Sequence, residues 1–142
     1  MTDNKVESVR NIALVGPAGS GKTSLAESLL AKTGAIKSAG AIDRGTTVCD
    51  FDPKERELMH SLETAICHFE HKGTRVHLVD TPGYPDFIGR SISVLPAVET
   101  AALVLSAQAG IETGIRRLME AAKASRLCRM IVINKIDMEP EK

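Results

Sequence analysis

The sequence predicts an α/β fold with a mainly parallel sheet. Short apolar segments alternate along the chain with segments of helical periodicity, which is the pattern of strands connected by helices. The 142 residues suffice for one domain with a hydrophobic core, and the apolar content of 43% is ordinary for a globular protein. The 18 Lys and Arg residues balance the 18 Asp and Glu residues, so the composition gives no general electrostatic reason to bind nucleic acid.

Five apolar segments are expected to form the strands of this sheet: residues 11–15, 65–70, 75–79, 101–106 and 130–133. The tetrapeptide "HKGT", residues 71–74, joins the second and third segments so closely that they should form an antiparallel hairpin. The sheet is therefore expected to be parallel except for one antiparallel strand.

Three segments are expected to form helices. The first begins at Gly21, the second near residues 87–91 and the third near Glu112. The third has the clearest helical periodicity, with an apolar stripe that should be buried and consists of Ile115, Leu118, Met119 and Ala122.

Two features concern the organisation of the chain. Residues 33–62 are polar and poorly periodic, and we expect a mobile loop at about residues 38–62, the switch loop, because long loops in compact domains are usually functional or disordered. The chain ends soon after the segment 130–133, without a helix to cover the edge of the sheet. We therefore expect a fragment of a longer protein, with one domain, residues 1–142, that is incomplete at its C-terminus.

The segment "GPAGSGKTS", residues 16–24, fits the phosphate-loop pattern G-x-x-x-x-G-K-S/T between a predicted strand and a predicted helix. Its glycines let the backbone curl until N–H groups point at phosphate oxygens, and the start of the helix adds a positive dipole end. The Lys22 ammonium can reach the β- and γ-phosphates, and the Thr23 hydroxyl can bind Mg²⁺. The predicted nucleotide-binding residues of this segment are Gly16, Ala18, Gly19, Ser20, Gly21, Lys22, Thr23 and Ser24. The pattern alone leaves ATP and GTP open.

The segment "VHLVDTPG", residues 76–83, is a predicted strand that ends in an aspartate and a glycine turn. Parallel sheets bind ligands at the carboxyl ends of their strands, so Asp80 should lie beside the phosphate loop and hold Mg²⁺ through water. Gly83 has no side chain, and its N–H can therefore approach a γ-phosphate. The tetrapeptide "DTPG" by itself also fits a helix N-cap turn, but its pairing with a phosphate loop favours a nucleotide site.

The segment "IVINKID", residues 131–137, places Asn134, Lys135 and Asp137 after the last predicted strand. The Asp137 carboxylate can accept hydrogen bonds from both N1–H and the exocyclic amine of guanine, a donor pair that adenine lacks. The Asn134 amide can brace the phosphate loop and reach the base edge, and the stem of Lys135 can lie over the ring. The three segments in this order favour a guanine nucleotide.

Together, residues 16–23, 80–83 and 134–137 resemble the GTP-binding domain of regulatory GTPases. "DTPGYPDF" followed by "NKID" is most similar to translational GTPases, particularly elongation factor G, and "GTTVCDFDP" with "DTPGY" is similar to the elongation factor G-like paralogues. The resemblance implies a P-loop NTPase fold of the Ras-like G-domain type, truncated before its last strand and helix, with GTP and GDP as ligands, Mg²⁺ as cofactor and a GTPase cycle. It also implies a protein of protein biosynthesis whose further domains engage the ribosome. The expected location is the cytoplasm, because residues 1–10 contain no apolar stretch that would fit a secretory signal.

Within this resemblance, a hydroxyl of the switch loop should complete the Mg²⁺ shell. "RGTT", residues 44–47, resembles the "RGIT" pattern that carries this threonine in the family. The required position lies just before the strand that pairs with residues 75–79, and counting back through the hairpin gives Ser61. The predicted metal ligands are Thr23, Ser61 and Asp80, with Thr64 and then Thr47 as alternatives to Ser61.

Departures from the family pattern bear on catalysis. Elongation factor G carries histidine after "DTPG", where this chain has Tyr84, which cannot become a cation near neutral pH. Phosphoryl transfer depends on positioning and electrostatics, so we predict slow hydrolysis, with Tyr84, Gly83 and Lys22 as the catalytic residues. Ala18 and Gly19 stand where the family has a larger apolar residue and an aspartate. The chain also ends before the family's Ser-Ala motif at the guanine, and we expect weaker GTP binding on that account.

Two other functions remain open: a GTP-sensing module with negligible hydrolysis, and a P-loop ATPase or kinase. His68 and His71 should face opposite sides of a strand and are not expected to share a metal, and His60 is interpreted as a solvated side chain. The cysteines match no metal or disulfide spacing, which fits a reducing compartment. The basic residues near Glu112 fit a solvent-facing surface better than a nucleic-acid patch, and no apolar segment is long enough to span a membrane.

Overall fold

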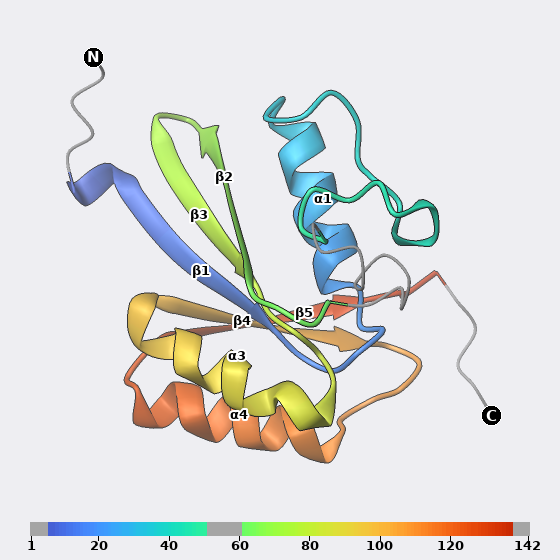
Figure 1. Cartoon of the computed structure of the whole chain (residues 1–142). Coiled ribbons are helices and arrows are strands. Elements are labelled where there is room, and N and C mark those ends of the chain that lie inside the picture. The colour runs from blue at the N-terminus through green and yellow to red at the C-terminus, as the bar shows by residue number, and fades with distance from the viewer. Residues whose placement is uncertain (1–5, 51–60, 138–142) are drawn as a thin grey trace.

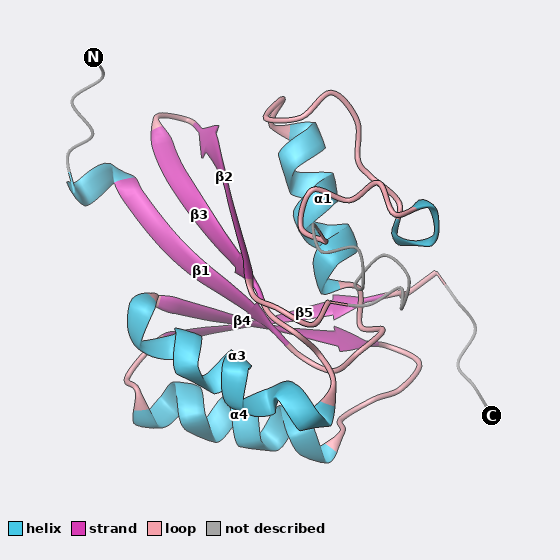
Figure 2. Cartoon of the chain, in the orientation of Figure 1, coloured by secondary structure: helices cyan, strands magenta, loops and turns pink. Residues whose placement is uncertain are grey.

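The computed structural model describes residues 6–50 and 61–137 of the chain (Figure 1). The middle of the predicted switch loop, residues 51–60, lies outside the described residues. His60, interpreted from the sequence as a solvated side chain, belongs to this segment. The described residues form a sheet with helices on both of its faces (Figure 2), which confirms the predicted α/β fold.

The sheet has five strands in the spatial order β2-β3-β1-β4-β5. The strands are β1 (Val9–Val15), β2 (Ala65–His71), β3 (Thr74–Asp80), β4 (Thr100–Ser106) and β5 (Cys128–Asn134). The pair β2–β3 is antiparallel and the other three pairs are parallel, so the predicted hairpin and mainly parallel sheet are confirmed. Strands extend slightly beyond the predicted apolar segments because backbone pairing continues past the apolar side chains, as where Val9 pairs with Arg75.

Among residues 6–50 and 61–137, three α-helices cover the sheet. Helix α1 (Lys22–Lys32) lies on one face, and α3 (Ile88–Val94) and α4 (Thr113–Ala124) pack together on the other (Figure 2). Short 3₁₀ turns are η1 (Val6–Ser8), η2 (Ile42–Arg44), η3 (Pro85–Phe87) and η4 (Leu95–Ala97). The predicted helix starts are confirmed, since Gly21 and Glu112 are the N-caps of α1 and α4. In the part of the chain that the structure describes, no helix has the length and apolar character needed to cross a membrane.

Each face of the sheet has its own hydrophobic core. On one face α1 packs Ala26 and Leu30 against the strands. On the opposite face the predicted stripe of α4 is buried, with Ile115, Leu118 and Ala122 inside the core and Met119 packed against it. The central strands β1 and β4 contribute residues to both cores, which explains their nearly continuous apolar sequence. These two cores hold the ends of the strands in place.

The three predicted motifs meet at the carboxyl edge of the sheet. Strand β1 leads into the phosphate loop, β3 ends at Asp80 and β5 ends at Asn134. Leu14 of β1 lies in register with Asp80, and the N–H of Ala107, just after β4, donates to the Asn134 carbonyl oxygen at 2.9 Å. Parallel order thus brings segments far apart in the sequence to one edge, where open α/β sheets bind their ligands.

Candidate functional site

The phosphate loop connects β1 to α1 and contains two glycines with no room for a side chain. An added Cβ would lie 2.3 Å from the carbonyl oxygen of Val104 at Gly16, and 2.3 Å from Nδ2 of Asn134 at Gly21. Gly21 also has a φ of 92° at the N-cap of α1, a conformation that favours glycine. The Val104 backbone therefore leaves no room for a side chain at Gly16, and at Gly21 the positive φ and the Asn134 amide together favour glycine.

Lys22 is 6% exposed, and its ammonium lies inside the curl of the phosphate loop. Its Nζ donates to the carbonyl oxygens of Gly16 and Pro17, each at 2.9 Å. Burial lowers the pKa of Lys22 to about 8, although the negative charge of Asp80 acts in the opposite direction. An ammonium group has three N–H donors, so two bonds to the loop leave one for a phosphate oxygen.

Asp80 and Thr23 form the buried centre of the site. The Thr23 hydroxyl donates to Asp80 Oδ2 at 2.6 Å, and Asp80 is 1% exposed. Burial raises the pKa of Asp80 to about 6, against the lowering effects of the Thr23 hydrogen bond and the Lys22 charge.

Two buried polar atoms in this region have no hydrogen-bond partner among the described residues. They are the second carboxylate oxygen of Asp80, Oδ1, and the hydroxyl oxygen of Ser20 in the phosphate loop. Buried polar atoms in native proteins are almost always paired, so an unpaired carboxylate oxygen and an unpaired loop hydroxyl in one region indicate a site for a polar or ionic ligand.

The described contacts favour Ser61 among the predicted switch-loop hydroxyls. Ser61 Oγ lies 3.4 Å from Thr23 Oγ1. Thr47, in contrast, is buried and donates to Asp50 Oδ2 at 2.9 Å. Thr64 directly precedes β2, and its assignment as an alternative stays a prediction.

Asp50 is a candidate site residue that the sequence reasoning missed. It is 3% exposed, and its Oδ1 accepts a hydrogen bond from the Ser61 hydroxyl at 2.6 Å. An aspartate in a polar loop has no spacing that marks it, and the segment "GTTVCDFDP" indicates only the family resemblance. Its carboxylate holds Ser61 toward Thr23.

The oxygen atoms at this centre fit a hard divalent cation. Hydroxyl and carboxylate oxygens are the donors that Mg²⁺ accepts, usually alongside water and phosphate oxygens. Among the described residues no group of three or more His, Cys, Asp or Glu side chains could hold a metal ion. A cation here would therefore depend on hydroxyls and on a bound phosphate as well as on Asp80.

A cavity of about 320 Å³ brings most predicted site residues together. Its lining includes Ala18, Gly19, Gly21, Lys22, Thr23, Ser24, Asp50, Ser61, Gly83, Tyr84 and Lys135. At Gly83 an added Cβ would lie 2.5 Å from the backbone nitrogen of Ala18, and the approach of the Gly83 N–H to a γ-phosphate stays a prediction. The bracing contact predicted for Asn134 is present too, with Nδ2 donating to the Ser20 carbonyl oxygen at 3.0 Å. Asp137 is exposed and does not line this cavity, so its role stays a prediction.

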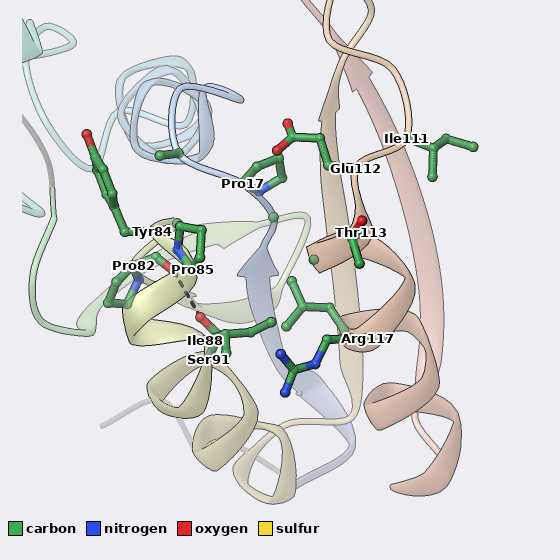
Figure 3. A pocket seen from close by; sticks show the side chains of 15 residues that line it. Pro17, Pro82, Tyr84, Pro85, Ile88, Ser91, Ile111, Glu112, Thr113 and Arg117 are labelled. Atoms are coloured by element: carbon green, nitrogen blue, oxygen red, sulfur yellow. Dashed lines mark hydrogen bonds between the residues drawn. The ribbon is translucent and has the colours of Figure 1, made fainter.

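A second cavity of about 640 Å³ lies between the phosphate loop, residues 82–91 and the start of α4 (Figure 3). Pro17, Ile88 and Arg117 line it from these three sides, and the Ser91 hydroxyl donates to the Pro82 carbonyl oxygen within it at 2.9 Å. The two cavities share Ala18, Gly83 and Tyr84. Sequence reasoning gave no sign of this second cavity.

Comparison with known proteins identifies the family. The profile described as "Elongation factor Tu GTP binding domain" matches residues 7–142. The chain belongs to this family. Its fold is accordingly that of a P-loop G domain, as predicted, and the members of this GTP-binding family are GTPases that generally use Mg²⁺.

Relatives of this GTP-binding family cover nearly the whole chain. An "Elongation factor G-like protein" of Mycobacterium tuberculosis is 39% identical over 136 residues, which is 96% of this chain and 19% of the relative. "Tetracycline resistance protein TetM" of Enterococcus faecalis is 39% identical over 127 residues, which is 89% of this chain and 20% of the relative. The chain thus spans about a fifth of the length of these relatives.

Solved structures agree with the family assignment. A crystal structure of a protein from Thermus thermophilus superposes with a TM-score of 0.89 at 40% identity, covering 94% of this chain and 20% of that protein. A bacterial selenocysteine-specific elongation factor, EF-Sec, superposes with a TM-score of 0.72 at 21% identity, covering 93% of this chain and 21% of that protein. At 21% identity, the likeness to EF-Sec shows a shared fold and nothing further.

Proposed function

We propose that this chain is the GTP-binding domain of an elongation factor G-like translational GTPase, which hydrolyses GTP to GDP and phosphate with Mg²⁺ as cofactor. The observation that carries the proposal is the pair of unpaired buried oxygens, Asp80 Oδ1 and Ser20 Oγ, in the region of the phosphate loop. Membership of a GTP-binding family supports the choice of nucleotide.

The phosphates are held by the loop in this proposal. The Lys22 ammonium contributes a donor and a charge at the β- and γ-phosphates, and the backbone N–H groups of residues 18–24 contribute further donors. The N–H of Gly83 faces the γ-phosphate from the opposite side. The contact between Gly83 and the Ala18 backbone supports this arrangement.

The hydroxyls of Thr23 and Ser61 and, through water, the Asp80 carboxylate would hold Mg²⁺. When bound, the ion neutralises charge on the β- and γ-phosphates. Asp50 orients the Ser61 hydroxyl by accepting its hydrogen bond at 2.6 Å.

Guanine recognition is assigned to the loop after β5. Asp137 accepts the N1–H and amine hydrogens of the base, Lys135 covers the ring, and Asn134 connects this loop to the phosphate loop. The hydrogen bond from Asn134 to the Ser20 carbonyl oxygen supports the last of these roles.

Tyr84 is proposed to position the attacking water through its phenol group. A phenol is neutral near pH 7 and stabilises developing negative charge less than an imidazolium, so hydrolysis is slow. The same observation supports a second candidate, a GTP-sensing module with negligible hydrolysis. Single-turnover hydrolysis distinguishes the two, because the module would bind GTP and leave it uncut.

The ribosome is the proposed partner, reached through the longer protein that contains this domain, and the cytoplasm is the proposed location. The elongation factor G-like relative supports both.

Competition binding tests the proposed nucleotide. A fluorescent GTP analogue should bind the chain in the presence of Mg²⁺ and be displaced by GTP and GDP but not by ATP. The Lys22→Ala variant should lose binding, and Asp137→Ala should lose the preference for guanine. Displacement by ATP as effective as by GTP would contradict the guanine assignment and favour an ATPase or kinase.

A further inference from the structure

The side chain of Glu27, in helix α1, accepts two hydrogen bonds from the backbone of the switch loop. Glu27 lies one helical turn after Thr23 and is 1% exposed. Its Oε2 accepts the N–H of Gly40 at 2.8 Å, and its Oε1 accepts the N–H of Val48 at 2.5 Å. A single buried carboxylate thus holds the backbone at two points that are eight positions apart in the sequence.

The backbone between these two points is closed on itself. The N–H of Thr46 donates to the Ala41 carbonyl oxygen at 3.2 Å, and the N–H of Ala41 donates to Thr46 Oγ1 at 3.0 Å. At Gly40 an added Cβ would lie 2.4 Å from the Thr46 carbonyl oxygen, so the two ends of this segment lie against each other. Residues 40–48 therefore form a compact loop that Glu27 attaches to α1.

The attached loop leads directly to the candidate metal site. Cys49 follows Val48 and is 3% exposed in the core beneath α1. Asp50 comes next and accepts the Ser61 hydroxyl at 2.6 Å, and Ser61 Oγ lies 3.4 Å from Thr23 Oγ1. A continuous series of contacts runs from Glu27 through the loop to the metal site and returns to α1 at Thr23.

We propose that Glu27 is a positioning residue for the metal site: it fixes residues 40–48 against α1 and thereby holds Asp50 and Ser61 beside Thr23. This inference rests on the proposed function, since the positioned groups act through Mg²⁺ on bound GTP. In this proposal Glu27 acts through the loop, and its negative charge also contributes to the raised pKa of Asp80.

The Glu27→Gln variant removes this function with the smallest change of shape. Both oxygens of the carboxylate accept an N–H, whereas an amide offers one oxygen and an NH₂ group that faces the other donor. One buried N–H is then left without an acceptor, and the loop is released at one of its two points of attachment. The matched control is Glu120→Gln, the same substitution at an exposed position of α4.

The test measures the affinity of a fluorescent, non-hydrolysable GTP analogue with saturating Mg²⁺ and again with excess EDTA. With Mg²⁺, Glu27→Gln should bind about tenfold more weakly than the unsubstituted chain and than Glu120→Gln. With EDTA the three proteins should bind equally, because the positioned groups act through the metal. An equal loss under both conditions would show a purely structural role and overturn the proposal.

A second measurement tests the proposal even where Glu27→Gln lowers the overall stability of the chain. Asp50→Asn removes the next connection in the series, so adding Glu27→Gln to it should cause little further loss of Mg²⁺-dependent affinity. Fully additive losses would contradict a pathway through Asp50. An unsubstituted chain that binds no guanine nucleotide would overturn the proposed function itself and this inference with it, a result distinct from either failure of the variants.

Discussion

At the scale of single residues, the site contains a buried cation, Lys22, and a buried anion, Asp80. Burial shifts the pKa of each in the direction that favours its neutral form. Burial lowers the pKa of Lys22 to about 8 and raises that of Asp80 to about 6. Each charge partly offsets the effect of burial on the other. Both charged side chains have lost the stabilisation that water gives to exposed charges, and bound ions of opposite charge would replace it.

Asp80 gives the ligand-free chain a specific pH dependence. Its folded-state pKa of about 6 exceeds the ordinary value of 3.8, so the folded state binds more protons between these values and the free energy of unfolding falls as the pH rises from about 4 to about 6. Relative to Asp80→Asn, the unsubstituted chain should lose roughly 1–3 kcal/mol of stability across this window. Urea unfolding of both proteins at several pH values measures the difference; a constant difference would contradict the assignment.

Tyr84→His should accelerate GTP hydrolysis, because a histidine at this position can share a proton and carry positive charge near the γ-phosphate. General acid–base and electrostatic groups contribute about 10²-fold or more when well placed, so we expect at least about a tenfold increase in the single-turnover rate. Tyr84→Phe is the control, and it should lower the rate if the phenol positions water. Identical rates for all three proteins would remove Tyr84 from the catalytic set.

The sequence predicted some of the candidate site residues and missed others for a definite reason. Lys22, Asp80 and Asn134 lie at fixed spacings from the ends of strands, and Ser61 was located by counting back through a hairpin. Asp50 and Glu27 could not be found in this way, because their partners depend on the path of an irregular loop.

At the scale of elements, the start of α1 and the end of β5 form one unit. Gly21→Ala would place a methyl group 2.3 Å from Nδ2 of Asn134 at a φ of 92°. We expect it to destabilise the chain by about 1–3 kcal/mol and to weaken nucleotide binding. Thermal unfolding and analogue binding measure both effects.

The matched control is Gly114→Ala in α4. No heavy atom lies within 4 Å of an added Cβ there, and alanine favours helix, so stability should stay equal or rise slightly. A Gly21→Ala variant as stable as Gly114→Ala would contradict the close packing of the phosphate loop against Asn134.

Helices and strands were predictable where their apolar side chains recur at a regular spacing along the sequence. The stripe of α4 and the hairpin of β2 and β3 follow from local patterns. The region of α3 was located only approximately, because η3 and η4 flank a helix of 7 residues and prolines interrupt its pattern.

At the scale of the whole molecule, β5 is the last strand of the described sheet and carries an exposed apolar row. Ile131 is 56% exposed and Ile133 is 61% exposed, two positions apart on one face. Exposed apolar edge strands favour pairing between molecules, so we expect concentration-dependent self-association of the 142-residue chain.

Ile131→Lys should reduce this association and leave nucleotide binding unchanged. Val6→Lys, at a residue that is 89% exposed and outside the sheet, is the control and should not alter it. Sedimentation velocity over a range of concentrations measures the effect. Equal association of both variants and the unsubstituted chain would exclude the β5 edge as the contact.

The wall between the two cavities has a consequence for the volume on each side of it. Gly83 and Tyr84 bound the cavity at the phosphate loop and also the larger cavity near α4 (Figure 3). A displacement of this short partition enlarges one compartment and shrinks the other. Filling one compartment by displacing this partition therefore leaves less room in the other, and whatever fills the space near α4 shares a boundary with the cavity at the phosphate loop.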